Sequence, residues 1–348
     1  MIDEIQRVPE LLLAIKEQVD VDARPGQYLL TGSARVLGLR AFPDTLPGRT
    51  ETIELWPFTQ GEIDGGPDGF VDTLFGGAEL PQHDSPVGRA EYAERIVRGG
   101  FPEAIARDRP ARRERFFDSY VSDLIARDVS QLSVIERPAQ MRALLRLLAG
   151  RSGQLLVANA LSNDLALAAR SVHRYLALLE EVFLIKRIPA WSRNVSARAI
   201  GTPKIAFVDS GVAANLLDAD ARSLLRPGGQ FGPLLEGFVA MEISRQLVWS
   251  RTRTELSHYR TKDGTEVDVV LEDRRGRVVG IEVKASSTVR ADDFRGLRHL
   301  AERLGDEFLA GIVLYTGHQT FPFGPRLRAM PVSSIWELPA ATPASAPD

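Results

Sequence analysis

The sequence contains no cysteine, which excludes disulfide bridges and thiol chemistry. No apolar run reaches membrane-spanning length, and the N-terminus lacks a signal-peptide pattern. We therefore expect a cytoplasmic protein without a membrane partner. The histidines show no metal-ligand spacing, which argues against a zinc site; they are His83, His173, His258, His299 and His318.

Neither sign of charge dominates the composition. Of the 348 residues, 44% are hydrophobic and 26% are charged, and the net charge is −3. These values are those of a soluble globular protein, and the length suggests two or three domains. Because the whole chain carries little net charge, any surface that attracts nucleic acid has to be local.

The phosphate-binding motif G-x-x-x-x-G-K-[ST] is also missing, so no such loop cradles nucleotide phosphates. An Asp-Glu pair at the end of an apolar strand holds Mg²⁺ and activates water in P-loop ATPases. Asp3 and Glu4 form such a pair, but only one apolar residue after the initiator precedes them. The pattern then predicts a helix from Pro9 to Val19 and a buried strand from Gly26 to Ser33.

The richest pattern lies between Phe231 and Gly317 and predicts an α/β domain. Apolar residues recur at helical spacing in its first part and alternate with polar residues afterwards. The predicted elements are a helix over 231–249, strands over 256–260, 266–271 and 278–284, a helix over 293–304 and a strand over 310–315.

Three charged residues interrupt the apolar pattern of two of these strands. Asp268 lies between two valines, and Glu282 and Lys284 share one face of their strand because side chains alternate along it. If the two strands are neighbours, two carboxylates and one ammonium converge. Carboxylates suit Mg²⁺, and a lysine beside it orients water or stabilises charge on a phosphate.

This order of elements resembles the PD-(D/E)XK nuclease fold. The resemblance implies catalytic roles for Glu236, Asp268, Glu282 and Lys284, with Mg²⁺ held by Asp268 and Glu282. The residue before Asp268 is Val267, where the family name has proline. The alternative is that Glu-x-Lys is a solvated strand face.

A second resemblance covers nearly the whole chain. The stretches 2–9, 29–33, 47–49, 55–62, 99–102, 191–194 and 323–324 look like AAA+ ATPases that carry a C-terminal DUF4143 region. It implies that Asp3 and Glu4 are the Walker B pair, Ser33 is at sensor 1 and Arg49 is an arginine finger.

The part of such an ATPase before Walker B is absent, so the start codon is misplaced, the gene is truncated or the ATPase is degenerate. We expect that this polypeptide does not hydrolyse ATP, that ATP binds only in a complete relative, and that Asp3 and Glu4 are surface charges.

The middle of the chain is predicted to be helical. Residues 63–86 are rich in Gly, Pro and Asp and predict a loop, followed by helices over 89–105 and 111–132. Residues 137–186 have the layout of a winged helix-turn-helix, with helices over 138–148, 158–164 and 171–182 and a wing strand over 183–189.

In that layout Ser171 is a plausible N-cap of the third helix. Arg170, His173 and Arg174 would reach phosphates or base edges in a DNA groove. Winged helices also serve as packing or protein-interaction modules, so this alternative stays open. Further along, Asp209 is expected to cap the next helix.

Together these patterns predict an α/β multidomain chain. The expected divisions are a partial P-loop AAA+ core over 1–62, a helical lid or linker over 63–136, the winged helix over 137–190, the nuclease-like DUF4143 domain over 191–338 and a disordered tail over 339–348. One interpretation is a Mg²⁺-dependent, DNA-acting protein. The other is a regulatory protein that uses the nuclease-like fold as a scaffold for a protein partner or a second copy.

Overall fold

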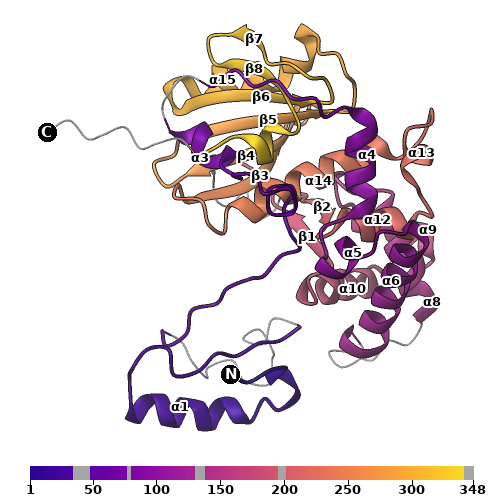
Figure 1. Cartoon of the computed structure of the whole chain (residues 1–348), viewed down its shortest axis with the longest axis vertical. Coiled ribbons are helices and arrows are strands. Elements are labelled where there is room, and N and C mark those ends of the chain that lie inside the picture. Colours follow the sequence, from indigo (N-terminus) through magenta and orange to yellow (C-terminus); the bar gives the residue numbers. More distant parts are fainter. Residues whose placement is uncertain (34–47, 77–79, 130–137, 195–200, 341–348) are drawn as a thin grey trace, which may run out of the picture.

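The computed structural model describes residues 1–33, 48–76, 80–129, 138–194 and 201–340. It contains a small N-terminal unit, a group of helices and a six-stranded sheet (Figure 1). Within the described ranges, no helix is both long and apolar enough to cross a bilayer.

The N-terminal unit has its own small core. It contains η1 (Ile5–Arg7) and α1 (Leu11–Val21), packed through buried Ile5, Leu12 and Ile15. In Figure 1 it lies apart from the helices and the sheet. The predicted buried strand from Gly26 to Ser33 is wrong: the segment forms a single bridge, from Leu30 to Ile2, and Leu29 is 61% exposed. One bridge partner does not cover a strand.

The region predicted as a loop is partly helical and buried. It contains the end of α2 (Gln60–Asp64) and all of α3 (Phe70–Phe75), whose Phe70 and Val71 are fully buried. The prediction was wrong because the Gly- and Pro-rich flanks hid one short apolar turn.

The two helices predicted next are each interrupted. The first becomes α4 (Arg89–Arg98) and α5 (Pro102–Ile105), separated at Gly99, whose φ of +70° favours glycine. The second is α6 (Pro110–Asp123), which passes into a π-helix, η3 (Leu124–Val129). The last three residues of that prediction, 130–132, lie outside the described residues.

Three helices and a strand follow in the predicted order, and a second strand pairs with the first to form a hairpin. They are α8 (Pro138–Ala149), α9 (Ala158–Leu165), α10 (Ala169–Glu181), β1 (Ile185–Ile188) and β2 (Lys204–Phe207). Ala168, not Ser171, occupies the N-cap position of α10, so that capping prediction is wrong. After α12 (Ser210–Leu216) comes α13 (Ala221–Leu224). The Asp209 prediction is confirmed, because its Oδ1 accepts hydrogen bonds from Gly211 N and Val212 N at 2.8 and 3.1 Å.

The sheet has the order β3-β4-β5-β6-β8-β7. Four strands match the predictions closely: β3 (Thr254–Arg260), β4 (Glu266–Asp273), β5 (Val278–Lys284) and β6 (Phe308–Tyr315). Two strands were not predicted, β7 (Phe321–Gly324) and β8 (Leu327–Pro331). Strands β5, β6 and β8 are parallel, and the other pairs are antiparallel.

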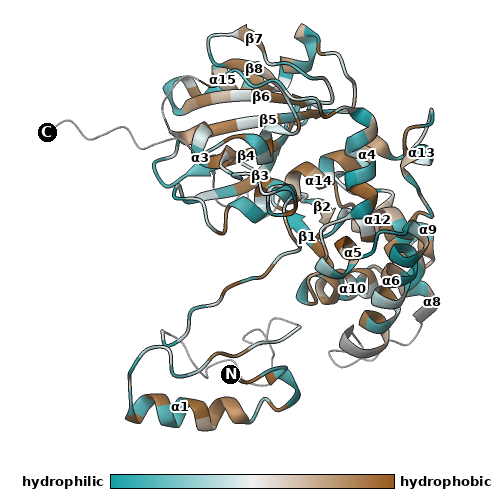
Figure 2. Cartoon of the chain, in the orientation of Figure 1, coloured by the Kyte–Doolittle hydropathy of each residue, from teal (hydrophilic) through white to brown (hydrophobic). Residues whose placement is uncertain are grey.

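Helices cover both faces of this sheet. On one face lies α15 (Arg295–Leu304), preceded by η4 (Ala291–Phe294) and followed by η5 (Gly305–Glu307). Its Leu297 and Leu300 pack against Gly280 of β5. The other face carries α14 (Phe231–Gln246) and joins the core of the helical part, which α16 (Ser334–Glu337) also contacts. Figure 2 shows that the central strands are largely apolar.

Helix α14 is buried on nearly all sides, so its polar side chains bond to distant parts of the chain. Glu242 Oε2 accepts from Gln60 N at 2.8 Å, and the Arg245 guanidinium pairs with Glu242. Arg245 also donates to Phe58 O at 3.1 Å and to Val208 O at 2.7 Å. Gln246 Nε2 donates to Ile335 O at 2.6 Å. These bonds hold three separate segments against one helix.

Removing the Arg245 guanidinium should therefore destabilise the whole fold. Arg245→Met leaves the Glu242 carboxylate buried without its counter-charge, which costs roughly 3–5 kcal/mol. Urea denaturation measures this loss. Arg303→Met on the exposed face of α15 serves as the control and should change stability by less than about 0.5 kcal/mol. Equal stability of the two variants would contradict the role assigned to Arg245.

Candidate active site

Asp268 and Glu282 come from neighbouring strands, β4 and β5, as predicted. Asp268 lies in a β-bulge, because the pairing with β3 shifts between Ser257 and Tyr259. A bulge re-aims the side chain that it carries. The Asp268 Oδ2 atom accepts a hydrogen bond from Val283 N at 2.9 Å, so the carboxylate is tied to the strand that carries Glu282.

A lysine that the sequence analysis missed contacts Asp268. Lys204 Nζ lies 2.6 Å from Asp268 Oδ1 and 3.8 Å from Glu236 Oε2, and its side chain is only 6% exposed. Lys204 opens β2, which belongs to the hairpin and not to the sheet. One feature of the sequence could have indicated this lysine: it directly precedes the apolar run from Ile205 to Val208. A charged residue that begins a buried strand usually has a charged partner.

Glu236 approaches from α14, because the chain before β2 packs tightly on this helix. Gly153 has a φ of +79°, and a Cβ there would lie 2.7 Å from the Glu236 Cβ. The Gly153 N–H donates to Ile205 O at 2.7 Å. The close approach at Gly153 thus brings β2, and with it Lys204, next to Glu236.

Lys284 pairs with Glu282 at the end of β5. Its Nζ lies 2.8 Å from Glu282 Oε1, and its side chain is 31% exposed. The second Glu282 oxygen, Oε2, is buried without a hydrogen-bond partner. The four predicted residues therefore lie together at one end of the sheet. Lys284 pairs with Glu282, and Lys204, which was not predicted, pairs with Asp268 beside Glu236. We call these five residues the carboxylate cluster.

Three carboxyl groups and only two lysines meet at this end of the sheet. Burial, together with the nearby Asp268 and Glu282 and against the opposing effect of Lys204, raises the pKa of Glu236 to about 8. Burial also raises the pKa of Glu282 to about 8, with Asp268 acting in the same direction. Burial alone would lower the pKa of Lys204, but Asp268 and Glu236 together hold it above its ordinary value.

The carboxylate oxygens of this cluster are of the type that binds a hard cation, but Lys204 already pairs with one of them, Asp268 Oδ1. Among the described residues, no group of three or more His, Cys, Asp or Glu side chains is arranged to hold a metal ion. Two carboxylates suffice for Mg²⁺, which retains several waters, and the unpartnered Glu282 Oε2 is a suitable ligand atom. A cation on both Asp268 and Glu282 requires Lys204 to leave Asp268 Oδ1.

His258 lies close to this cluster but faces a backbone group. Its Nε2 is 3.0 Å from Thr202 O, and the side chain is buried in β3. Burial lowers the pKa of His258 to about 4, which keeps the imidazole neutral. A neutral, buried histidine of this kind is better suited to hold β3 beside the bulge in β4 than to transfer protons.

The residues of the predicted ATPase site lie in the N-terminal unit. Ser33 Oγ lies 3.4 Å from Glu4 Oε2, and Thr31 Oγ1 donates to Asp3 Oδ1. Asp3, Glu4 and Ser33 are thus neighbours, which suits a Walker B pair beside sensor 1. Arg49 pairs with Asp20 at the end of α1, with Nε 2.7 Å from Oδ1.

The residues predicted to contact DNA lie together on α10. Arg170, His173 and Arg174 are all exposed. They occupy the side of α10 opposite to Val172 and Leu176, which are buried in the core. These three side chains are therefore accessible to a partner, and we predict that the partner is DNA.

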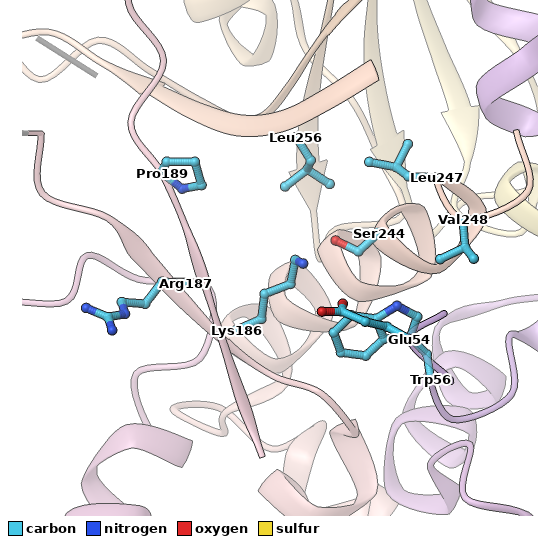
Figure 3. A pocket seen from close by; sticks show the side chains of 9 residues that line it. All are labelled: Glu54, Trp56, Lys186, Arg187, Pro189, Ser244, Leu247, Val248 and Leu256. Atoms are coloured by element: carbon cyan, nitrogen blue, oxygen red, sulfur yellow. The ribbon is translucent and has the colours of Figure 1, made fainter. Parts of the chain in front are cut away.

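A separate pocket lies between β1, the end of α14 and the segment before α2. Figure 3 shows the Lys186, Trp56 and Ser244 side chains that line it; its volume is about 280 Å³. Lys186 Nζ lies 5.0 Å from the centroid of the Trp56 ring. None of the carboxylates of the cluster lines this pocket.

Three family matches divide the chain. Residues 1–64 match an AAA domain, residues 89–223 match a domain of unknown function, DUF8612, and residues 231–335 match another, DUF4143. The chain combines an AAA domain with a C-terminal DUF4143 region. This architecture is ATPase-like. The carboxylate cluster lies in the DUF4143 region, except for Lys204, which the DUF8612 match contributes.

Two curated relatives match nearly the whole chain. They are the uncharacterized protein Rv2008c of Mycobacterium tuberculosis and the uncharacterized protein Mb2031c of Mycobacterium bovis. Each is 28% identical over 338 residues, which cover 96% of this chain and 68% of the relative. No solved structure matches the chain.

The raised carboxyl pKa values predict that stability falls as pH rises. Glu236 and Glu282 titrate near 4.5 in the unfolded chain and at about 8 in the folded protein. The folded state therefore holds protons that the unfolded state has released, and stability falls as the pH rises from about 4.5 to about 8.

Urea denaturation at pH 5 and pH 8 in EDTA measures this dependence. Glu236→Gln and Glu282→Gln should each flatten the pH profile, whereas Glu302→Gln on α15 should leave it unchanged. Profiles with the same slope in all four proteins would show that these two carboxyls do not titrate in this range.

Proposed function

We propose that the DUF4143 region is a divalent-cation-dependent phosphodiesterase that acts on DNA, and that in this chain it accompanies an AAA-type domain. The single observation that carries this proposal is the unpartnered, buried Glu282 Oε2 beside Asp268 and Glu236. Burying an acceptor without a donor is costly. A bound cation would satisfy this atom and stabilise the ionised form of the carboxyl groups around it.

Each residue of the cluster then has a distinct part. Asp268 and Glu282 would hold Mg²⁺, which supplies Lewis-acid stabilisation of a phosphate oxygen. The Lys284 ammonium, which lies 2.8 Å from Glu282 Oε1 and is partly exposed, would orient a water or neutralise charge on the scissile phosphate. Glu236, with its raised pKa, is suited to accept a proton near neutral pH.

The choice of DNA as substrate rests on α10. Its exposed Arg170, His173 and Arg174 lie on the third helix of a three-helix and hairpin unit. In a winged helix this is the helix that enters the major groove. The hairpin of the same unit carries Lys204 into the cluster, so a DNA contact on α10 and the carboxylates belong to one connected structure.

One observation favours a second candidate function, a non-catalytic scaffold. Lys204 Nζ already neutralises Asp268 at 2.6 Å. A carboxylate satisfied in this way needs no metal, and a buried ion pair then serves to dock the hairpin on the sheet. In that case the region would bind a protein partner or a second copy and cleave nothing.

Cleavage of supercoiled plasmid separates the two functions. With Mg²⁺ or Mn²⁺ the wild type should produce nicked circles, and Lys284→Ala should reduce the rate roughly 100-fold or more, because it removes a charge-stabilising donor. Lys262→Ala, on the exposed β3–β4 turn, should behave as wild type. Activity that survives in Lys284→Ala, or no activity on any DNA form, would favour the scaffold.

Cation affinity tests the place of Lys204 directly. Lys204→Met removes the ammonium from Asp268, so Mn²⁺ should bind at least about tenfold more tightly than to wild type, or by about 1.4 kcal/mol. Isothermal titration calorimetry and the shift of Tm with Mn²⁺ measure this. Lys262→Met is the matched control. Unchanged affinity in Lys204→Met would mean that no cation uses Asp268.

A further inference from the structure

A hollow lined mostly by arginines lies at the opposite end of β4 and β5. Its volume is about 440 Å³. The charged residues that line it are Arg251, Arg253, Arg274, Arg275, Arg277 and Asp273. We call this set the arginine cradle. Five cations against one anion stand out in a chain whose net charge is −3.

The cradle is built from two loops, and an aspartate fixes the backbone of each. Asp273 Oδ1 accepts from Arg275 N and Arg277 N, both at 2.9 Å. Asp72 of α3 accepts from Arg251 N and from the next residue's N–H, at 3.2 and 3.0 Å. Both loops are therefore held in shape before any ligand arrives, which lowers the entropy cost of binding.

The guanidinium groups of the cradle are left largely uncompensated. Arg277 pairs with Asp273, with Nε 2.7 Å from Oδ2. Arg251, Arg253, Arg274 and Arg275 make no ion pair among the described residues, and all four are exposed. The pairing of Thr254 with Asp273 sets Arg253 beside Arg274, so the two loops contribute to one surface.

We propose that the arginine cradle binds the phosphodiester backbone of a polynucleotide. Guanidinium groups pair with phosphate oxygens through two parallel hydrogen bonds. The cradle is open and spans two loops, which suits a chain of successive phosphates. A free nucleotide would also need an apolar slot for its base, and the residues lining the hollow are all polar or charged.

This site is not part of the carboxylate cluster. Arg277 directly precedes β5, whereas Lys284 ends it. At about 3.3 Å per residue, Arg277 and Lys284 lie about 23 Å apart along the strand. The inference therefore goes beyond the proposed phosphodiesterase, and it stands or falls by binding alone.

Fluorescence anisotropy with a labelled oligonucleotide, single- or double-stranded, tests the cradle in EDTA, where no cation-dependent cleavage occurs. Arg274→Gln/Arg275→Gln should weaken binding by roughly tenfold per arginine near 0.1 M salt and lower the slope of log K against log salt by about 2. Arg251→Gln/Arg253→Gln, on the other loop, should do the same. The control Arg295→Gln/Arg303→Gln makes the same change of net charge on α15 and should bind as wild type.

The other outcomes overturn the proposal. Equal affinities and salt slopes in the two cradle variants and the α15 control would show that the cradle does not contact phosphates. Displacement of the oligonucleotide by equimolar ATP would assign the site to free nucleotides. Equal binding of polyglutamate of the same charge would assign it to acidic polypeptides. Thermal melts of each variant confirm that it is folded.

Discussion

The fold depends on the burial of α14 on nearly all sides. Because water does not reach this helix, its polar side chains need hydrogen-bond partners within the protein. Glu242, Arg245 and Gln246 meet this constraint by bonding to the backbone of segments far away in the sequence. Arg245 alone joins Phe58 O and Val208 O. The segment from Phe58 to Gln60, the residue that follows β2 and helix α16 are thereby fixed to one helix, and the position of Glu236 follows from that of the helix.

The carboxylate cluster results from the same packing. Its acids come from β4, β5 and α14, and its two lysines come from β2 and β5. No single element contains a complete site. The cluster exists because the hairpin, the helix and the sheet meet at one edge, where Gly153 permits the close approach. Because buried polar groups depend on one another for their partners, displacing any one of these elements would leave charges of the others unpaired.

Much of the sheet could be predicted, because β4 and β5 alternate or run apolar over their full length. Asp268, Glu282 and Lys284 followed from the same periodicity. Lys204 did not, because its partner lies 64 residues away in sequence and only the packing of β2 on α14 brings them together. Strand β7 escaped prediction because Pro322 and Gly324 mask a short edge strand. The apolar turn of α3 was likewise hidden between glycines.

The hairpin that carries Lys204 and the strands that carry its acidic partners are different parts of the fold. A ligand that competes with the Lys204 ammonium for Asp268 weakens the packing of β2 against the sheet. By linkage, that packing weakens binding of the ligand by the same free energy. Because α10 leads directly into β1, and β1 pairs with β2, a partner bound to α10 is linked through the hairpin to the Lys204–Asp268 ion pair at the end of the sheet.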